Sequence, residues 1–288
     1  MAPTLEPIEE ADARGEIAVF YDDFRATVRS TFVPTVFRAL ARYPGYMLPA
    51  WTALRPNLAS TEAEQLAGRL RVIVIERLKP IVEGRPLPAI GMRPEARGEI
   101  RAVLEAFFYV VPKAFVALAA LGETWEGRPI RGRAGPPPRT VPHGAPSSMP
   151  AVPLVDHTTD DTRVRRMFDE ATGVLGRPVV PSLYRALARW PEYLESVWRP
   201  LTDAAALAGY RDAAPALVEA AVRGCHGLPL VFAFDRATAA RSLDGDALAS
   251  IEWILSGFRR TMPETVFEIA RLLRDLDRGH VRGRAQAT

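Results

Sequence analysis

The sequence of 288 residues contains one cysteine, Cys225, so it cannot form an internal disulfide. It has only four histidines and two lysines, and it lacks the run of about 18 uninterrupted apolar residues that a membrane-spanning helix requires. Its N-terminus is acidic, whereas a signal peptide starts with positive charge and an apolar core. These absences predict a soluble, cytoplasmic protein that has no membrane partner.

Positive charge comes almost entirely from arginine, and the chain has a formal net charge of +3 and a pI near 9.2. Its basic runs, Arg128–Arg133 and Arg278–Arg284, lie in a proline-rich segment and in the C-terminal tail, without interleaved aromatic residues. Nucleic-acid binding requires a basic stripe together with residues that stack on bases or read a groove. The sequence therefore predicts no nucleic-acid partner.

Apolar residues recur with helical spacing along the chain. Val33, Val36, Phe37 and Leu40 follow the i, i+3, i+4, i+7 pattern, and good helix formers fill segments such as 63–78, 96–110 and 216–225. No segment alternates with period two, so an all-α fold is predicted. The same helical-wheel reasoning places four arginines on a solvated face: Arg38, Arg42, Arg185 and Arg189.

The segment 126–152 is dense in proline and glycine, which predicts an extended, semi-rigid linker. It separates a helical repeat at 1–125 from a second at 153–288. When the chain is shifted by 147 positions, FVPTVFRALARYPGYMLPAW lies on VVPSLYRALARWPEYLESVW without a gap. This duplication predicts two tandem helical repeats that form a pseudo-dimer within one chain.

The duplicated halves, the linker that runs into MPAVPLVD at 149–156, the paired RALAR[YW]P motifs and the AFFYVVPKAF segment at 106–115 resemble the group I 2-haloacid dehalogenases of the DehI type. The resemblance extends over essentially the whole chain. It implies helical halves related to the alkylhydroperoxidase and carboxymuconolactone decarboxylase fold, with the active site between them. It implies neither a metal nor a cofactor.

The same resemblance implies hydrolysis of a carbon–halogen bond beside a carboxylate, with an aspartate that activates water and an asparagine that holds it. The family's aspartate follows a serine, which is Ser182 here, and Leu183 occupies the aspartate position. The family's asparagine precedes the proline that is Pro112 here, and Val111 occupies its position. A leucine cannot accept a proton and a valine cannot hold a water, so the scaffold is expected without the family's chemistry. Pro112 is expected at a helix start or kink.

Other candidates for chemistry have simpler interpretations. Cys225 and His226 are adjacent on a helix and point about 100° apart, so a structural role is favoured over a nucleophile and its base. The remaining histidines, His143, His157 and His280, share no ligand spacing, so no metal site is predicted. The hydroxyls near Pro34 and Pro181 are expected either to line a pocket or to be packed in the core and cap helices.

The sequence thus predicts a 2-haloacid dehalogenase-like protein whose pocket between the halves takes a small organic acid or an apolar ligand, and it leaves a homo-oligomer open. The alternative is a divergent hydrolase of a small carboxylic acid with a relocated base, drawn from Ser182, Tyr184, Tyr109 and His226. No catalytic residue is assigned. The residues expected to line the pocket are Phe32, Thr35, Tyr109, Val111, Ser182, Leu183 and Tyr184.

Overall fold

The computed structural model describes residues 6–83, 87–88, 91–173 and 175–285, with side chains for all of these except Ala205 and 277–285. It confirms the predicted all-α class. The only strands in the described part are two of two residues each, β1 (Ile130–Arg131) and β2 (Val231–Phe232), which pair antiparallel. The basic tail and His280 fall among residues whose side chains lie outside this description.

Among the described residues, six helices precede the first strand and six follow it. The first six are η1 (Glu10–Asp12, a 3₁₀ turn), α1 (Gly15–Val28), α2 (Thr35–Leu40), α3 (Pro44–Leu58), α4 (Thr61–Val82) and α5 (Pro94–Trp125). The others are α6 (Thr162–Gly173), α7 (Ser182–Leu187), α8 (Pro191–Thr202), α9 (Ala204–Cys225), α10 (Arg236–Ala239) and α11 (Gly245–Ala285).

Proline sets the boundaries of the two short helices, α2 and α7. Pro34 and Pro181 are their N-cap residues, and Pro44 and Pro191 begin the next helices, α3 and α8. Proline suits the first turn of a helix because the amide hydrogen that it lacks would have no partner there. All six residues of α2 and all six of α7 are buried, so each short helix is surrounded by the protein on every side.

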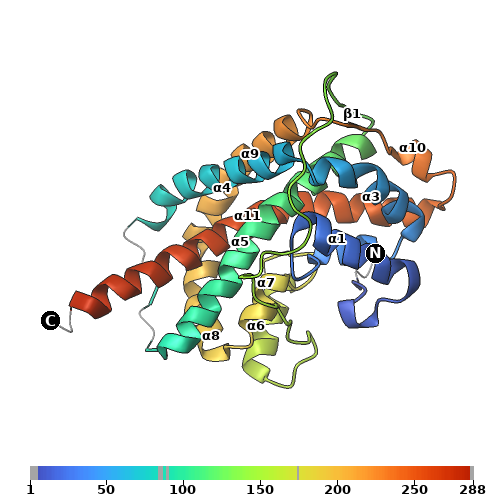
Figure 1. Cartoon of the computed structure of the whole chain (residues 1–288). Coiled ribbons are helices and arrows are strands. Elements are labelled where there is room, and N and C mark those ends of the chain that lie inside the picture. Colours follow the sequence, from blue (N-terminus) through green and yellow to red (C-terminus); the bar gives the residue numbers. More distant parts are fainter. Residues whose placement is uncertain (1–5, 84–86, 89–90, 174, 286–288) are drawn as a thin grey trace.

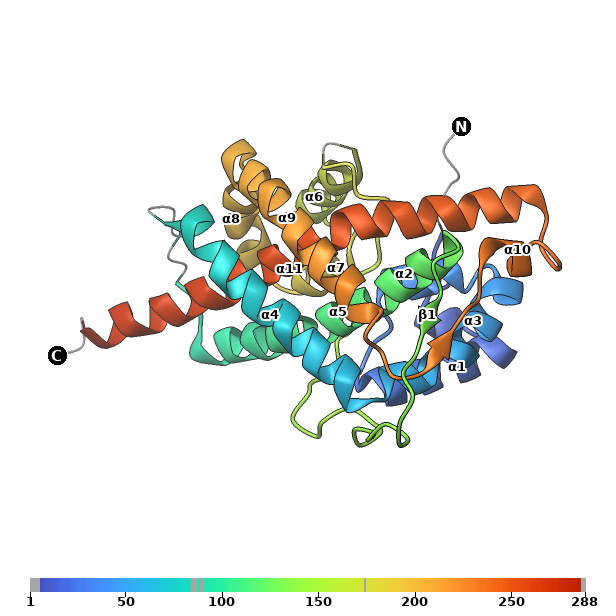
Figure 2. The ribbon, with the colours of Figure 1, turned by 90° about the horizontal axis from the view of Figure 1, so that it is seen from above.

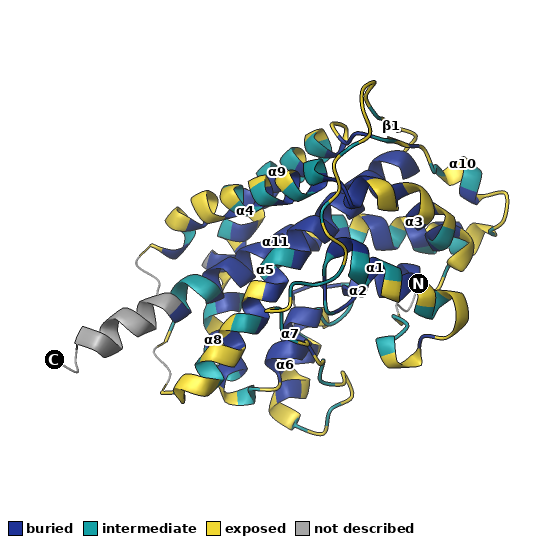
Figure 3. Ribbon diagram, in the orientation of Figure 1, coloured by how far each residue is buried: buried dark blue, intermediate teal, exposed yellow. Residues whose placement is uncertain are grey.

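Two long helices form the centre of the molecule. Helix α11 packs along α5, and α4 and α9 pack against each other and against both (Figures 1 and 2). The residues of α5 from Val110 to Trp125 are all buried, which Figure 3 shows as a nearly continuous dark band. Pro112 lies inside this continuous helix, which excludes a helix start there; the predicted alternative, a kink at Pro112, stays a prediction.

Helix α5 is also the one described helix that is long and apolar enough to cross a membrane by length and composition. Most of its apolar window, 78%, is buried inside the protein, against α4, α9 and α11. Its hydrophobicity is therefore accounted for by its place in the core of the protein.

The chain between α5 and α6 contains no helix. It runs over the first helices and bonds to them, with an isolated bridge between Ser60 and Thr140 and a hydrogen bond from the Gly144 amide to the Ala26 carbonyl. Helices α2 and α7 begin at Thr35 and Ser182, which the sequence repeat aligns with each other. The duplication itself and the boundaries 1–125, 126–152 and 153–288 stay predictions.

Candidate ligand-binding cavity

The first residues of α2 and α7 meet in the interior of the protein. The hydroxyl oxygens of Thr35 and Ser182 lie 2.6 Å apart and share a hydrogen bond. Neither hydroxyl caps its helix, so the capping interpretation is wrong. Because Pro34 and Pro181 hold the N-cap positions, the hydroxyls at the first helical positions are free to face each other.

A small cavity of about 60 Å³ adjoins this pair of hydroxyls. Its walls come from α2, α5, α7, α11 and the loop 175–181. The lining residues are Phe32, Pro34, Thr35, Val36, Phe107, Val111, Arg177, Pro178, Val179, Pro181, Ser182, Leu183, Phe258, Thr261, Met262 and Thr265.

Five of the seven residues expected in the pocket line this cavity: Phe32, Thr35, Val111, Ser182 and Leu183. The two tyrosines lie elsewhere. The hydroxyl of Tyr109 bonds to Glu64 at 3.2 Å, and that of Tyr184 bonds to Glu268 at 2.7 Å. Each tyrosine hydroxyl therefore donates a hydrogen bond to a carboxylate that does not line the cavity.

Val111 and Leu183, 6% and 1% exposed, are on the wall of the same cavity although 72 positions separate them in the sequence. Residues of the described lining include no carboxylate, carboxamide, histidine or cysteine. The polar lining is limited to the hydroxyls of serine and threonine and to Arg177. The cavity thus lacks a group that accepts a proton at neutral pH.

Arg38 lies behind the hydroxyl pair. Its Nη2 donates to Thr35 Oγ1 at 3.3 Å and to Ser182 Oγ at 3.2 Å, and its side chain has no exposed surface. The prediction of a solvated arginine face is therefore wrong for Arg38 and also for Arg185, whose side chain is 7% exposed. It is correct for Arg42 and Arg189, which are exposed.

The carboxylate of Glu9 forms ion pairs with both buried arginines, Arg38 and Arg185. It pairs with Arg38 through one oxygen and with Arg185 Nη1, at 2.7 Å, through the other. Burial acts to raise the pKa of Glu9, but Arg185 and Arg38 outweigh it and hold that pKa below its usual value. Glu10 also interacts with Arg38, and Asp156 with Arg185, so the two arginines lie among several carboxylates, with Glu9 in contact with both.

The Thr35 and Ser182 hydroxyl groups have two protons, and the hydrogen bond between them uses only one. Arg38 donates to both oxygens, so the hydroxyl protons must find other acceptors. One of them bridges Thr35 and Ser182, and the described residues offer no acceptor for the other. The cavity side of the pair is therefore a hydrogen-bond donor, strengthened by the charge of Arg38.

Arg177 is a lining residue that the sequence reasoning missed. Its Nη1 donates to the Thr261 carbonyl at 2.6 Å, and its Nη2 lies 2.6 Å from Glu268 and 3.3 Å from Glu264. Burial raises the pKa of Glu268, and the positive charge of Arg177 opposes that rise. The available signal was the Gly-Arg-Pro sequence just before the second repeat motif, where a lone arginine enters an apolar loop.

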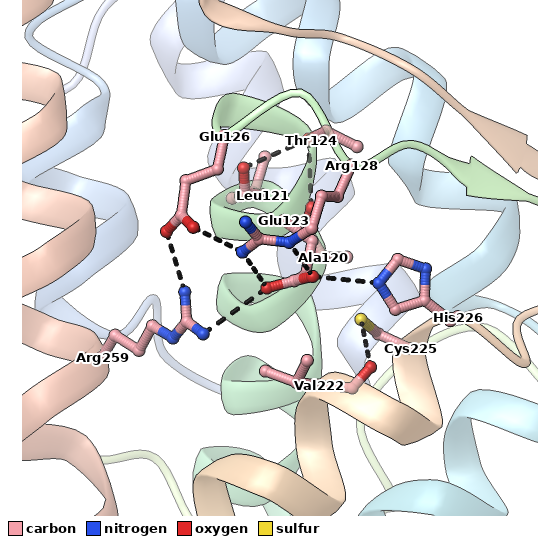
Figure 4. A network of polar contacts seen from close by, with 10 residues as sticks. All are labelled: Ala120, Leu121, Glu123, Thr124, Glu126, Arg128, Val222, Cys225, His226 and Arg259. Carbon is pink, nitrogen blue, oxygen red and sulfur yellow. Dashed lines mark hydrogen bonds and ion pairs between the residues drawn. The ribbon is translucent and has the colours of Figure 1, made fainter.

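Cys225 and His226 belong to a different polar cluster, centred on Glu123 of α5 (Figure 4). Burial and the charge of Glu123 raise the pKa of the Cys225 thiol to about 12, so it stays protonated and unreactive at neutral pH. His226 Nε2 lies 3.0 Å from Glu123, which also accepts two hydrogen bonds from Arg128. The structural interpretation of Cys225 and His226 thus agrees with their surroundings.

Of the other histidines, His143 and His157 do not line the cavity. His157 is exposed beside Asp156, and His143 is exposed in the segment between α5 and α6. The described part of the chain contains no group of three or more histidine, cysteine, aspartate or glutamate side chains arranged to hold a metal ion.

Comparison with known proteins gives consistent results. The family model described as "Halocarboxylic acid dehydrogenase DehI" matches residues 31–172. A protein of Alcaligenes xylosoxydans xylosoxydans, named "2-haloacid dehalogenase, configuration-inverting", is 29% identical over 281 residues, which are 94% of this chain and 93% of that protein. An "(R)-2-haloacid dehalogenase" of Pseudomonas putida is 25% identical over 268 residues, 88% of this chain and 89% of that protein.

Two solved structures of D-2-haloacid dehalogenase share the fold. A mutant form superposes with a TM-score of 0.85 at 22% identity and covers 96% of this chain and 97% of that one. A complex with L-LA gives a TM-score of 0.84 at 24% identity and covers 96% and 98%.

The protein belongs to the all-α class and encloses a small, largely apolar cavity. One end of this cavity adjoins the Thr35 and Ser182 hydroxyls, which accept hydrogen bonds from Arg38. The family predicted from the motifs is confirmed: the chain is a relative of the group I 2-haloacid dehalogenases of the DehI type.

Proposed function

We propose that this 2-haloacid dehalogenase-like protein binds a small organic acid, or an apolar molecule of similar size, in the cavity between its two halves and does not hydrolyse it. The observation that carries the proposal is that Val111 and Leu183 line one cavity with no proton acceptor in its wall. The positions that the family resemblance assigns to catalysis therefore contribute apolar surface only. We place this activity in the cytoplasm, without a nucleic-acid or membrane partner.

A small carboxylate fits the polar end of the cavity. The remaining proton of the Thr35–Ser182 pair is available to a carboxylate oxygen, and the Arg38 guanidinium that donates to both hydroxyls strengthens that hydrogen bond. The aliphatic and aromatic walls suit a short hydrocarbon chain. Since about 60 Å³ is less than half of the roughly 150 Å³ that admits benzene into an engineered cavity, the walls must move apart when the ligand binds.

The alternative, a hydrolase with a relocated base, has little support in this geometry. Ser182 lines the cavity, but its hydroxyl bonds to Thr35 and Arg38, and no base adjoins it. The buried carboxylate of Glu268, which pairs with the lining residue Arg177, accepts hydrogen bonds from Arg177 and Tyr184. Each of its oxygens is thus already occupied.

Calorimetric titration with propionate, and with propionamide as its uncharged counterpart, tests the proposal. We expect propionate to bind the wild type and to bind the Ser182→Ala variant about tenfold more weakly, because a charge-assisted hydrogen bond contributes about 1.5 kcal/mol. Ser196→Ala is the matched control, since Ser196 bonds only to the Tyr193 carbonyl in α8. Failure of propionate to bind the wild type would contradict the proposal.

A further inference from the structure

A second, larger hollow lies beside the cavity, between α9 and α11. This outer groove has a volume of about 670 Å³ and opens to solvent. Helix α9 contributes Arg211 and Val218 to its wall, and α11 contributes Arg260, Thr261 and Glu264. Its volume exceeds that of the cavity about tenfold, so a small acid has ample room in it.

One thin partition separates the outer groove from the cavity. Thr261 lines both hollows. Arg177 lines the cavity, while its ion-pair partner Glu264, 3.3 Å away, lines the groove. The side chain of Arg177, held by Glu264 and by the Thr261 carbonyl, therefore stands between the two spaces.

The loop 175–181 carries this partition. Leu175 lines the groove, and Arg177, Pro178 and Val179 line the cavity. Gly176 has a φ of +63°, a left-handed conformation that only glycine adopts at little cost. Pro178 rests against Gly257 of α11, where an added Cβ would lie 3.2 Å from the proline ring. The loop thus covers the cavity and contacts α11 through the Pro178 ring and through Arg177, which bonds to the Thr261 carbonyl, to Glu268 at 2.6 Å and to Glu264 at 3.3 Å.

The charge of the groove favours an anion. Arg259 at its edge is neutralised by Glu123 and Glu126 (Figure 4). Arg260 is exposed in the groove, and no acidic partner for it is described. Exposed, unpaired arginine attracts carboxylates and raises their local concentration.

We propose that the outer groove is the access site for a small carboxylate, and that the loop 175–181 is a lid, latched by Arg177 to Glu264, that opens to admit the acid to the cavity. The inference rests on the proposed binding function for its ligand. The opening of the lid itself is a property of the empty protein, and it is therefore measurable without any acid.

A thiol placed on the cavity wall reports the opening. In a Cys225→Ala background, which removes the native thiol, Val111→Cys is labelled with methyl methanethiosulfonate, a small neutral reagent, and followed by mass spectrometry. We expect Glu264→Gln to accelerate the labelling about tenfold, because it removes one charged partner of the latch. Glu219→Gln is the matched control, since Glu219 lines the same groove but pairs only with Arg223, and it should leave the rate unchanged.

Two further measurements separate lid opening from loosening of the whole fold. Val28→Cys in the core of α1, where Val28 has no exposed surface, should label at the same slow rate in the Glu264→Gln protein and its parent. Hydrogen exchange in the Glu264→Gln protein should accelerate within 175–181 and not elsewhere in the core. Equal labelling of Val111→Cys in the Glu264→Gln and Glu219→Gln proteins would overturn the lid. Absence of propionate binding in calorimetry would instead overturn the binding function.

Discussion

Glu9 is the residue on which the polar end of the cavity depends. It is the shared carboxylate of Arg38 and Arg185, both of which are buried, and Arg38 in turn holds the Thr35 and Ser182 hydroxyls. Removing one charge of a buried ionic group is costly because the remaining charges lose their compensation. A change at Glu9 therefore disturbs the ion pairs of Arg38 in α2 and of Arg185 in α7.

We predict that Glu9→Gln lowers the free energy of unfolding by about 3 kcal/mol, because it removes the one carboxylate that contacts both buried guanidinium groups. Glu6→Gln, three positions earlier and exposed, should change it by less than about 0.5 kcal/mol. Urea unfolding of the two variants and the wild type measures both values. Equal stabilities would show that the two arginines are compensated elsewhere.

Reasoning from sequence named apolar residues that line the cavity, although their role in binding stays a prediction, and it misplaced two of the charges behind it. Phe32, Val111 and Leu183 were predicted from motif positions, and they line the cavity. Arg38 was assigned to solvent by a helical wheel, which assumes one solvated face. That assumption fails for a six-residue helix buried on all sides. No local pattern reveals that a glutamate near the N-terminus neutralises an arginine of each repeat motif.

At the scale of elements, α4 and α9 pack closely against each other at two glycines. A Cβ built on Gly224 of α9 would lie 2.3 Å from Leu66 Cδ1, and one built on Gly209 would lie 2.9 Å from Ile81 Cγ2. Both contacts are shorter than side-chain atoms tolerate. Glycine at these two positions therefore lets the two helices approach as closely as they do.

We predict that Gly224→Ala destabilises the protein by about 1–3 kcal/mol, because the added methyl group forces α4 and α9 apart or displaces Leu66. Gly68→Ala is the control: Gly68 is inside α4, and its Cβ would meet only the end of the Arg71 side chain at 3.6 Å. That change should stabilise the protein by about 0.5–1 kcal/mol through helix propensity. Thermal unfolding of the two variants distinguishes these opposite signs.

At the scale of the whole molecule, Glu123 links four segments. It is part of α5 and contacts Arg128 after that helix, His226 after α9 and Arg259 of α11 (Figure 4). Hydrogen bonds from Arg128, together with His226 and the charges of both arginines, outweigh burial and lower the pKa of Glu123 to about 2. This carboxylate therefore joins α5 to the segments that contain Arg128, His226 and Arg259 through hydrogen bonds and ion pairs.

The lowered pKa predicts acid sensitivity. A carboxylate with a folded-state pKa below its unfolded value contributes stability above the unfolded pKa and loses it as the pH falls toward the folded one. We expect Glu123→Gln to cost about 3 kcal/mol at pH 6 and progressively less between pH 5 and pH 2. Glu126→Gln, exposed but bonded to the same two arginines, should cost less than about 1 kcal/mol. A constant cost of Glu123→Gln over this pH range would contradict the assignment.

The central claim is that the dehalogenase scaffold is present and its hydrolytic groups are not. Halide release from D- and L-2-chloropropionate, measured for the wild type and for the Leu183→Asp, Val111→Asn double variant, tests it most directly. We predict no release by the wild type at the roughly 1–1,000 per second of typical enzymes, and measurable release by the double variant, whose partly desolvated carboxylate is a stronger base. Turnover by the wild type would contradict the claim and would mean that another residue acts as the base.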